Sequence, residues 1–298
     1  MKLLTGSWTP ECGHTWLTRG FGKVYSLRSL AEGSYLCVDG REYPTPGKHS
    51  CHITLLKNEA VVADYTSGSL SLYPLGVDGI PSGAPTVLNF EGSGPVSGRQ
   101  DGPHIHSSWL SPDGKSIVVV DLGSDKIYRF GVVGGALSME GVEAFPLPEG
   151  CGPRHCAVGK NKLYVSTELS DEVLVLDWPS MEILQRITVN DALPGGGGHV
   201  LISLDGKFLY VSSRLKNDGI GIFSIGPDGL LTRAGYCTTG AHPRHFCITP
   251  DGRKLLVACR DSNEIETFER SSVTGLLSPT GEKFHIEKPV FVEAYEED

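Results

Sequence analysis

The sequence predicts an all-β protein, a β-propeller built from repeats of about 46 residues. The first observation is an Asp-Gly turn that recurs on one period: Asp113 and Asp205 are 92 residues apart, and Asp205 and Asp251 are 46 apart. In such a turn the aspartate bonds its own backbone and the glycine takes a positive φ. The second observation is that apolar runs rich in Val, Ile, Leu, Tyr and Phe flank the turns. Short apolar runs between turns are typical of strands, and no long 3.6-residue periodicity indicates a helix.

Each repeat is expected to contain a strand, a tight turn, a second strand, a polar break and a third strand. A fourth turn on the same period, without Asp-Gly, lies in "VGKNKLYV" near residue 159. Three or four short strands per repeat are typical of a propeller blade. The five internal repeats all begin at a histidine: His52, His106, His155, His199 and His245.

The two ends of the chain are expected to share a blade. Residues 1–51 and 289–298 together hold 61 residues, which is more than one repeat and less than two. The C-terminal "KPVFVEAY" has the pattern of a first strand and the N-terminal "KLLTGSW" that of a second. Their pairing would close the ring and hide both sheet edges. We therefore expect one propeller domain over residues 1–298, with seven blades of which one is abridged in the Phe21–Ser50 region, or with six blades.

Charged residues mark the end of the second strand in each repeat. In a hairpin, the start of the first strand and the end of the second lie at the same end of the sheet. The histidines and the charged residues are therefore expected around one mouth of the central channel. Two Pro-Arg-His sequences place Arg154 and Arg244 in loops over that mouth. The charged residues at the strand ends are Asp64, Asp121, Glu168, Arg214 and Arg260.

The group of greatest interest is Glu168 with Arg154 and Arg214. A carboxylate flanked by two guanidinium groups suits a site for an anionic substrate with a general base. A purely structural ion network is the alternative, and the histidines could simply cap strands. Asp64 is expected to be a solvated turn residue, and Asp121 to hold a loop. Because Arg244 has Arg260 where Arg154 has a carboxylate, we place the chemistry at the first Pro-Arg-His and only binding at the second.

Composition excludes several classes of function. The formal net charge is −9, which argues against a general nucleic-acid or anionic-membrane surface, and no apolar run reaches membrane-spanning length. The first residues lack the apolar stretch of a signal peptide, so we expect a cytoplasmic protein, monomeric or weakly oligomeric. None of the eight cysteines forms a C-x-x-C pair, which argues against structural zinc, and they are expected to be buried apolar residues in a reducing compartment.

Several motifs resemble those of the propeller lactonases, a family that includes the bacterial-type 6-phosphogluconolactonases and the fungal carboxy-muconate cycloisomerases. These are "RQDGPHIHSSWLSPDGK", "GCGPRHCAV", "LYVSTEL", "DGKFLYVSSR" and "HPRHFCITPDGRKLLVA". The resemblance extends from about Ser34 to the end of the chain. It implies seven blades and a site at the channel mouth. The chain departs from the family pattern in four places: "SSR" replaces Ser-Asn-Arg, His245 replaces an acidic residue, Arg260 replaces an amide, and the first fifty residues are shorter than usual and are expected to lose much of one blade.

The resemblance also implies roles for individual residues. The family's functional positions fall on His104 or His106 of the P-H-x-H motif, Arg154, Glu168 and Arg214. We expect hydrolysis of a sugar-derived lactone, 6-phosphogluconolactone in particular, with His106 or Glu168 as general base. Arg154 and Arg214 would stabilise the oxyanion or hold the anionic group of the substrate. The expected substrate-binding residues are His104, His155, Arg244 and His245, with Arg244 and His155 at the phosphate.

Other functions remain open at this stage. The same groups would suit lactonisation of a muconate-type dicarboxylate, and a non-catalytic propeller could bind sugar acids or a protein partner. The chain has no G-x-S-x-G motif for a serine nucleophile. A mouth rich in Arg and His repels a hard cation, so we expect no catalytic metal and no cofactor. The four glycines at 195–198 are expected to be a linker between blades, with a phosphate-binding loop as the alternative.

Overall fold

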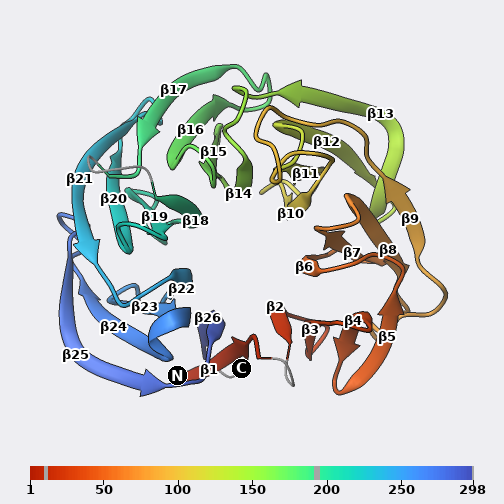
Figure 1. The fold of residues 1–298 in the computed structure, drawn as a ribbon, viewed down its shortest axis with the longest axis horizontal. Coiled ribbons are helices and arrows are strands. Elements are labelled where there is room, and N and C mark those ends of the chain that lie inside the picture. The colour runs from red at the N-terminus through yellow and green to blue at the C-terminus, as the bar shows by residue number, and fades with distance from the viewer. Residues whose placement is uncertain (10–12, 191–194, 297–298) are drawn as a thin grey trace. The chain divides into compact units, whose positions relative to one another are not determined.

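The computed structural model describes residues 1–9, 13–190 and 195–296, and these residues form strands joined by turns and loops. One short 3₁₀ turn, η1 (Arg260–Ser262), interrupts this pattern. The described residues form six four-stranded antiparallel sheets and one two-stranded sheet, and in each four-stranded sheet the strands follow chain order (Figure 1). The chain divides into two compact units, Pro10–Pro153 and Met1–Thr9 with Arg154–Asp298. The all-β prediction is confirmed.

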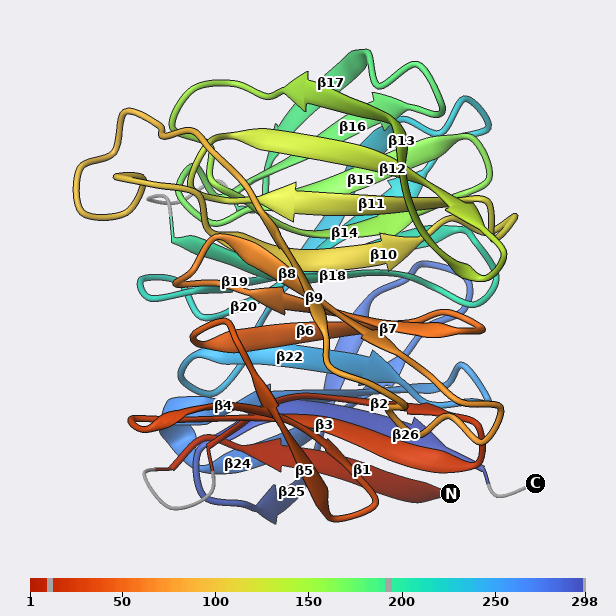
Figure 2. The ribbon, with the colours of Figure 1, turned by 90° about the vertical axis from the view of Figure 1, so that its right-hand side faces the viewer.

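The unit Pro10–Pro153 contains three four-stranded sheets. Figure 2 shows the loop between the second and third of these sheets, in yellow-orange, projecting beyond the ends of the strands of its own unit. This loop leads into the P-H-x-H motif. The strands are β2 (His14–Gly20), β3 (Lys23–Leu30), β4 (Gly33–Val38), β5 (Arg41–Thr45), β6 (Ser50–Leu55), β7 (Glu59–Asp64), β8 (Ser69–Pro74), β9 (Thr86–Asn89), β10 (Ile105–Leu110), β11 (Ser116–Asp121), β12 (Lys126–Val133) and β13 (Ala136–Pro146).

The second unit contains the other three four-stranded sheets and the two-stranded sheet of β1 and β26. Strand β14 begins at the boundary between the units. The strands are β1 (Lys2–Ser7), β14 (Pro153–Val158), β15 (Lys162–Thr167), β16 (Glu172–Asp177), β17 (Ile183–Thr188), β18 (Gly196–Ile202), β19 (Phe208–Arg214), β20 (Gly219–Ile225), β21 (Leu231–Thr238), β22 (Pro243–Ile248), β23 (Lys254–Cys259), β24 (Glu264–Arg270), β25 (Leu277–His285) and β26 (Pro289–Tyr295).

The sheet made by the chain ends confirms one prediction and corrects another. β26 pairs antiparallel with β1, from Lys2 opposite Tyr295 to Ser7 opposite Pro289, as the terminal sequences predicted. The predicted abridgement in the Phe21–Ser50 region is wrong, because β2–β5 form a complete four-stranded sheet. The short sheet is the one that the two ends share.

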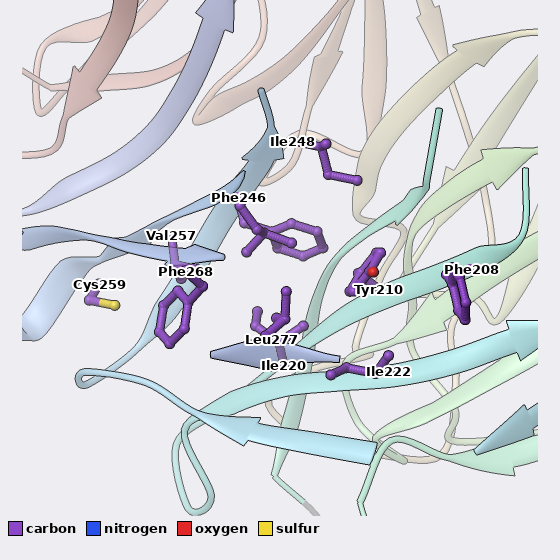
Figure 3. Packing of buried hydrophobic residues seen from close by; sticks show 11 residues of the cluster. Phe208, Tyr210, Ile220, Ile222, Phe246, Ile248, Val257, Cys259, Phe268 and Leu277 are labelled. Atoms are coloured by element: carbon purple, nitrogen blue, oxygen red, sulfur yellow. The ribbon is translucent and has the colours of Figure 1, made fainter. Parts of the chain in front are cut away.

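The core lies between successive sheets, and Figure 3 shows the cluster between the last two four-stranded sheets. Phe208 and Tyr210 of one sheet meet Phe246, Phe268 and other apolar side chains of the next. Each fully buried side chain of this size contributes about 1.5–3 kcal/mol. A similar cluster joins the sheet β6–β9 to β10–β13. The sheets therefore pack face to face, and this holds the strand ends with the polar side chains in place.

A β-bulge in the first hairpin of several sheets corrects the predicted equivalence of the histidines. The bulged residue is Cys51 in β6 and His106 in β10. His52 follows its bulge and pairs with Ala63, whereas His106 is itself the extra residue. The predicted equivalence of His106 with His52 is therefore wrong by one residue.

The same register separates the charged residues at the strand ends into two sets. Asp64 and Asp121 pair with the residue directly before the bulge. In β18–β19 that position belongs to Ser213, and Arg214 lies one residue further. Arg260 likewise follows Cys259, which pairs before the bulge of β22. A shift of one residue turns a side chain to the other face of the sheet, so the five charged residues do not form a single ring of equivalent positions.

Both aspartates are fully buried. Asp64 accepts hydrogen bonds from the hydroxyls of Ser50 and Ser71, the second at 2.6 Å, so its prediction as a solvated turn residue is wrong. Asp121 accepts the backbone N–H groups of His104 at 2.7 Å and Gly123 at 3.0 Å, which confirms its prediction as a loop-holding residue.

We predict that Asp64 makes stability decrease as the pH rises. Burial raises the pKa of Asp64 to about 6, against the opposing effect of the serine hydrogen bonds. Between the unfolded pKa near 4 and this value, the folded chain keeps a proton that the unfolded chain releases. The free energy of unfolding of the native chain, relative to Asp64→Asn, should therefore fall by up to about 3 kcal/mol between pH 4 and 6.5. Urea unfolding at a series of pH values measures this difference.

The matched control is Asp113→Asn, at an exposed turn. The pKa of Asp113 is lowered by its hydrogen bond with Ser111, so its contribution should appear as the pH rises through the acid range, opposite in sign to that of Asp64. Parallel stability curves for the native chain and Asp64→Asn would contradict the prediction.

Candidate active site

Two buried arginines meet one glutamate in the unit that contains β14–β26. Arg154 of β14 donates from Nε to Glu168 Oε2 at 3.0 Å, and Arg214 of β19 donates from Nη2 to the same oxygen at 2.7 Å. Glu168 directly follows β15. The side chains of Arg154, Glu168 and Arg214 are 3%, 13% and 4% exposed. The structure thus brings together the three residues that the sequence analysis singled out, and the partly exposed carboxylate marks the accessible side of the cluster.

Arg214 is held by three further contacts around its guanidinium, in addition to the contact with Glu168. Nε donates to Gly196 O at 3.2 Å, and Nη2 donates to Gly197 O at 3.1 Å as well as to Glu168. Nη1 donates to His242 Nε2 at 3.4 Å. A guanidinium group has five N–H donors. Among the described residues these contacts use four of them, which leaves one N–H of Nη1 for a ligand.

The glycine run at 195–198 shapes this part of the site. Gly196, Gly197 and Gly198 belong to β18, so the predicted linker between blades is wrong for them. A Cβ on Gly197 would lie 2.1 Å from Thr167 O, and one on Gly198 would lie 2.2 Å from Ser212 Oγ. The glycines therefore let β18 approach its neighbours closely enough for its carbonyl oxygens to reach Arg214.

Three histidines form a buried column behind Arg154. Arg154 Nη1 lies 3.3 Å from His155 Nε2, and His155 Nδ1 lies 3.0 Å from His199 Nδ1. Because a guanidinium group only donates, His155 must accept at Nε2 and carry its proton on Nδ1, from which it donates to His199. The ring of His199 stacks on that of His245 at 4.1 Å, and His245 stacks on Phe291 at 4.4 Å.

His245, one member of this column, is a neutral imidazole. Burial, aided by Arg154 and Arg244, lowers the pKa of His245 to about 3. His155 and His245 are 2% and 6% exposed. Their role in substrate binding stays a prediction. The structure gives them contacts with neighbouring protein groups, among them the backbone N–H of Val292, which donates to His245 Nδ1 at 3.4 Å.

His242 is a site residue that the sequence analysis missed. Its Nε2 accepts from Arg214, and its Nδ1 faces Asp261 Oδ2 at 3.4 Å. Burial lowers its pKa to about 3, with further lowering by Arg214, Arg260 and Arg244 against the opposing effect of Asp261. A signal was present in the sequence, because the two Pro-Arg-His copies are preceded by different residues, Gly152 and His242.

Both Pro-Arg-His sequences lie in strands, the first in β14 and the second in β22, so the prediction that they lie in loops is wrong. The second sequence carries its charges differently from the first. Arg244 is the half-buried bulged residue of β22. Arg260, in the position after the strand end where the first copy has Glu168, bonds both oxygens of Asp261 at 2.9 Å. Lys288 Nζ also lies 3.4 Å from Asp261. At this position the second copy therefore has an arginine, Arg260, in place of the glutamate, and this arginine forms an ion pair with its neighbour Asp261.

His104 and His106 belong to the other unit and are grouped there with Tyr65. The ring of His104 stacks on Tyr65 at 4.5 Å, and its Nδ1 lies 2.9 Å from Tyr65 O. His106 meets the edge of Tyr65 at 5.5 Å and is 5% exposed. Tyr65 was not singled out by the sequence analysis, although it directly follows Asp64, one of the residues at the strand ends.

Within the part of the chain that the structure describes, no group of three or more His, Cys, Asp or Glu side chains is arranged to hold a metal ion. No helix in residues 1–9, 13–190 and 195–296 has the length and apolar character needed to cross a membrane. The cysteines of this part, which excludes Cys12, are free thiols.

Comparison with known proteins identifies the class. Residues 21–294 match the family described as lactonase, 7-bladed β-propeller. The 6-phosphogluconolactonase of Bacillus subtilis is 31% identical over 261 residues, covering 83% of this chain and 73% of its own. The 6-phosphogluconolactonase of Formosa agariphila is 37% identical over 247 residues, covering 78% and 69%.

Solved structures agree with this result. A protein from Bacteroides fragilis superposes with a TM-score of 0.88 at 31% identity, covering 98% of this chain and 96% of its own. The periplasmic gluconolactonase of Pseudomonas aeruginosa has a TM-score of 0.89 at 22% identity, covering 98% of both chains, which shows the fold alone. The sheets of this chain are therefore those of an all-β propeller. The protein belongs to the seven-bladed β-propeller lactonase family, and the resemblance expected from its motifs is confirmed.

We predict that Gly197→Ala destabilises the protein. The added Cβ would lie 2.1 Å from the backbone oxygen of Thr167, so β18 must shift, at a cost of about 1–3 kcal/mol. The control is Gly131→Ala on β12, where the nearest heavy atom to the new Cβ, Ser138 Cβ, is 3.8 Å away. Urea denaturation of both variants checks the prediction, and equal stabilities would show that β18 does not need a glycine there.

Proposed function

We propose that the protein hydrolyses 6-phosphogluconolactone to 6-phosphogluconate at the cluster of Arg154, Glu168 and Arg214. The observation that carries the proposal is the pair of buried guanidinium groups on one carboxylate oxygen, with an N–H of Arg214 left for a ligand. Fixed N–H donors of this kind stabilise negative charge that develops on a carbonyl oxygen. The names of the Bacillus subtilis and Formosa agariphila relatives support the choice of reaction and substrate.

In the proposed reaction, water adds to the carbonyl carbon of the lactone. Glu168 accepts a proton from the water, and the carbonyl oxygen becomes an oxyanion that the Arg214 N–H and Arg154 stabilise. The bond between the carbonyl carbon and the ring oxygen then breaks. The ring oxygen leaves as a hydroxyl group by taking the proton back from Glu168. We assign the base to Glu168 in preference to His106, because Glu168 contacts both arginines directly.

The phosphate group of the substrate is proposed to bind Arg244, with His104, His155 and His245 as further substrate-binding residues. A local excess of arginine suits an anionic ligand in a chain whose net charge is −9. No cofactor or metal takes part in the proposed reaction. Lactonisation of a muconate-type dicarboxylate and simple binding of sugar acids are the alternatives that the assay below separates.

The remaining proposals concern the protein as a whole. We propose one domain over residues 1–298 with seven blades, of which the sheet β1–β26 is the short one and its terminal strands close the ring. A six-bladed count, which leaves out this short sheet, is the alternative. A cytoplasmic location and a monomeric or weakly oligomeric state stay predictions from the sequence.

We predict that the purified protein accelerates lactone opening well above the spontaneous rate, and that Arg214→Ala and Arg214→Lys lower kcat about 100-fold or more, as loss of an oxyanion donor does. Glu168→Gln, which removes the base and keeps the shape, should lower kcat strongly as well. The initial rate of acid release at constant pH measures each variant. The assay uses 6-phosphogluconolactone, unphosphorylated gluconolactone and a muconate.

The control is Arg186→Ala, which removes an exposed arginine whose partner is Glu172. This variant should keep the native rate because a surface pair contributes little. A native protein that adds nothing to the spontaneous rate would refute the proposed function. Turnover of the muconate alone would replace it by the cycloisomerase alternative, and binding of 6-phosphogluconate without turnover by the non-catalytic one.

A further inference from the structure

We propose that His242 is a positioning residue, a neutral imidazole that, with Asp261, fixes the orientation of the Arg214 guanidinium for its ligand. The inference rests on the proposed function for its kinetic consequences, but its geometry stands independently. His242 lies between the two groups, with Arg214 Nη1 at 3.4 Å from Nε2 and Asp261 Oδ2 at 3.4 Å from Nδ1.

The donors and acceptors of this chain fix the tautomer of His242. A guanidinium group can only donate, so Nε2 must offer a lone pair to Arg214. The proton of the neutral ring is then on Nδ1 and points to the carboxylate of Asp261. Asp261 is in turn held by Arg260, which bonds both of its oxygens, and by Lys288. Hydrogen-bond donation therefore runs in one direction, from Arg214 to His242 and from His242 to Asp261.

The surroundings of His242 keep the ring neutral. The side chain is 8% exposed, and Arg214, Arg260 and Arg244 all act on it, against the single carboxylate of Asp261. A protonated ring would lose its lone pair at Nε2 and would place a positive charge against Arg214. The acceptor is thus available to Arg214 throughout the neutral and mildly acidic range.

The backbone at this position points to a role for the side chain. His242 has a φ of +59°, and Gly152, which occupies the corresponding position before the first Pro-Arg, has a φ of +58°. Glycine adopts this conformation freely, whereas a histidine there is strained. Bonds to the neighbouring turn hold the strained residue, with Arg260 N donating to His242 O at 3.0 Å and Asp261 N to Ala241 O at 3.1 Å. A position suited to glycine therefore carries an imidazole that contacts Arg214.

The consequence for the site lies in the remaining N–H of Arg214. Nη1 carries two hydrogens, and the bond to His242 takes one of them, which fixes the direction of the other. Without His242, Arg214 keeps its bonds to Gly196, Gly197 and Glu168, so the cluster should still form. The loss should then appear in the orientation of the donor, and therefore in kcat more than in KM.

The test compares His242→Gly with His242→Gln. Glycine removes the imidazole and relieves the positive φ, so the melting temperature should stay level or rise while kcat falls about 10-fold or more. Glutamine offers an amide oxygen as acceptor and should recover part of that loss. The matched control is His49→Gly, an exposed histidine with a φ of +53°, which should change the melting temperature in the same direction and leave kcat unchanged. Native kcat in His242→Gly would overturn the proposal.

A double-mutant cycle tests whether His242 acts through Arg214. In an Arg214→Lys background, His242→Gly should cost little further activity, because the guanidinium that it orients is gone. A full, additive loss in that background would overturn the proposal.

Nitrogen NMR of the histidine rings gives a readout that needs no activity. It should show neutral His242 with its proton on Nδ1, and Asp261→Asn should weaken this preference. A proton on Nε2 would overturn the inference even if the lactonase assay succeeds, and an inactive native protein with the expected tautomer would refute the proposed function and leave the geometry intact.

Discussion

The site depends on the contact of Glu168 with two arginines. Arg154, Glu168 and Arg214 come from β14, the end of β15 and β19, so one carboxylate joins two neighbouring four-stranded sheets. Taking these charges out of water is costly, and the loss is recovered only where each finds fixed partners. The arginines find them in the carboxylate, the carbonyl oxygens of β18 and two imidazole nitrogens. Removing Glu168 would leave two buried guanidinium groups without their shared carboxylate.

A repeated backbone feature places the strands that carry these groups. Asp125, Asp171 and Asn263 directly precede the third strand of their sheets and have φ values of +52°, +54° and +56°. Their side chains accept backbone N–H groups just before the next sheet begins. Asp125 binds Gly150 and Gly152. Asp171 binds Gly195, and Asn263 binds Lys288. Asp and Asn tolerate the left-handed conformation and bond nearby backbone, so in these three places an Asp or Asn fixes where the following first strand starts.

The sequence was sufficient for the repeats, the strands, the pairing of the chain ends and the contact of Arg154, Glu168 and Arg214, because Asp-Gly turns and strand ends recur at fixed spacing. It was misleading about His106, because a bulge inserts one residue without changing the periodicity of the turns. It was also misleading about Asp64, because the serine hydroxyls that hold this carboxylate in the interior come from two other strands. The glycines of β18 look like a linker until the backbone of Thr167 is seen to lie beside them. His242 was missed because its contact with Arg214 joins residues 28 apart, in different sheets.

The two segments that contain Pro-Arg-His contribute different residues to one cluster. The first segment has Gly152 at the left-handed position and supplies Arg154 to Glu168. The second has His242 at that position and contacts Arg214 through it, while its Arg260 bonds Asp261. The sequence analysis assigned only binding to the second copy. The structure shows in addition that this copy contacts Arg214 through His242. The repeat supplies two copies of one backbone position, occupied by Gly152 in the first segment and by His242 in the second. The histidine brings the second segment into contact with Arg214, whereas the first segment supplies Arg154, which shares Glu168 with Arg214.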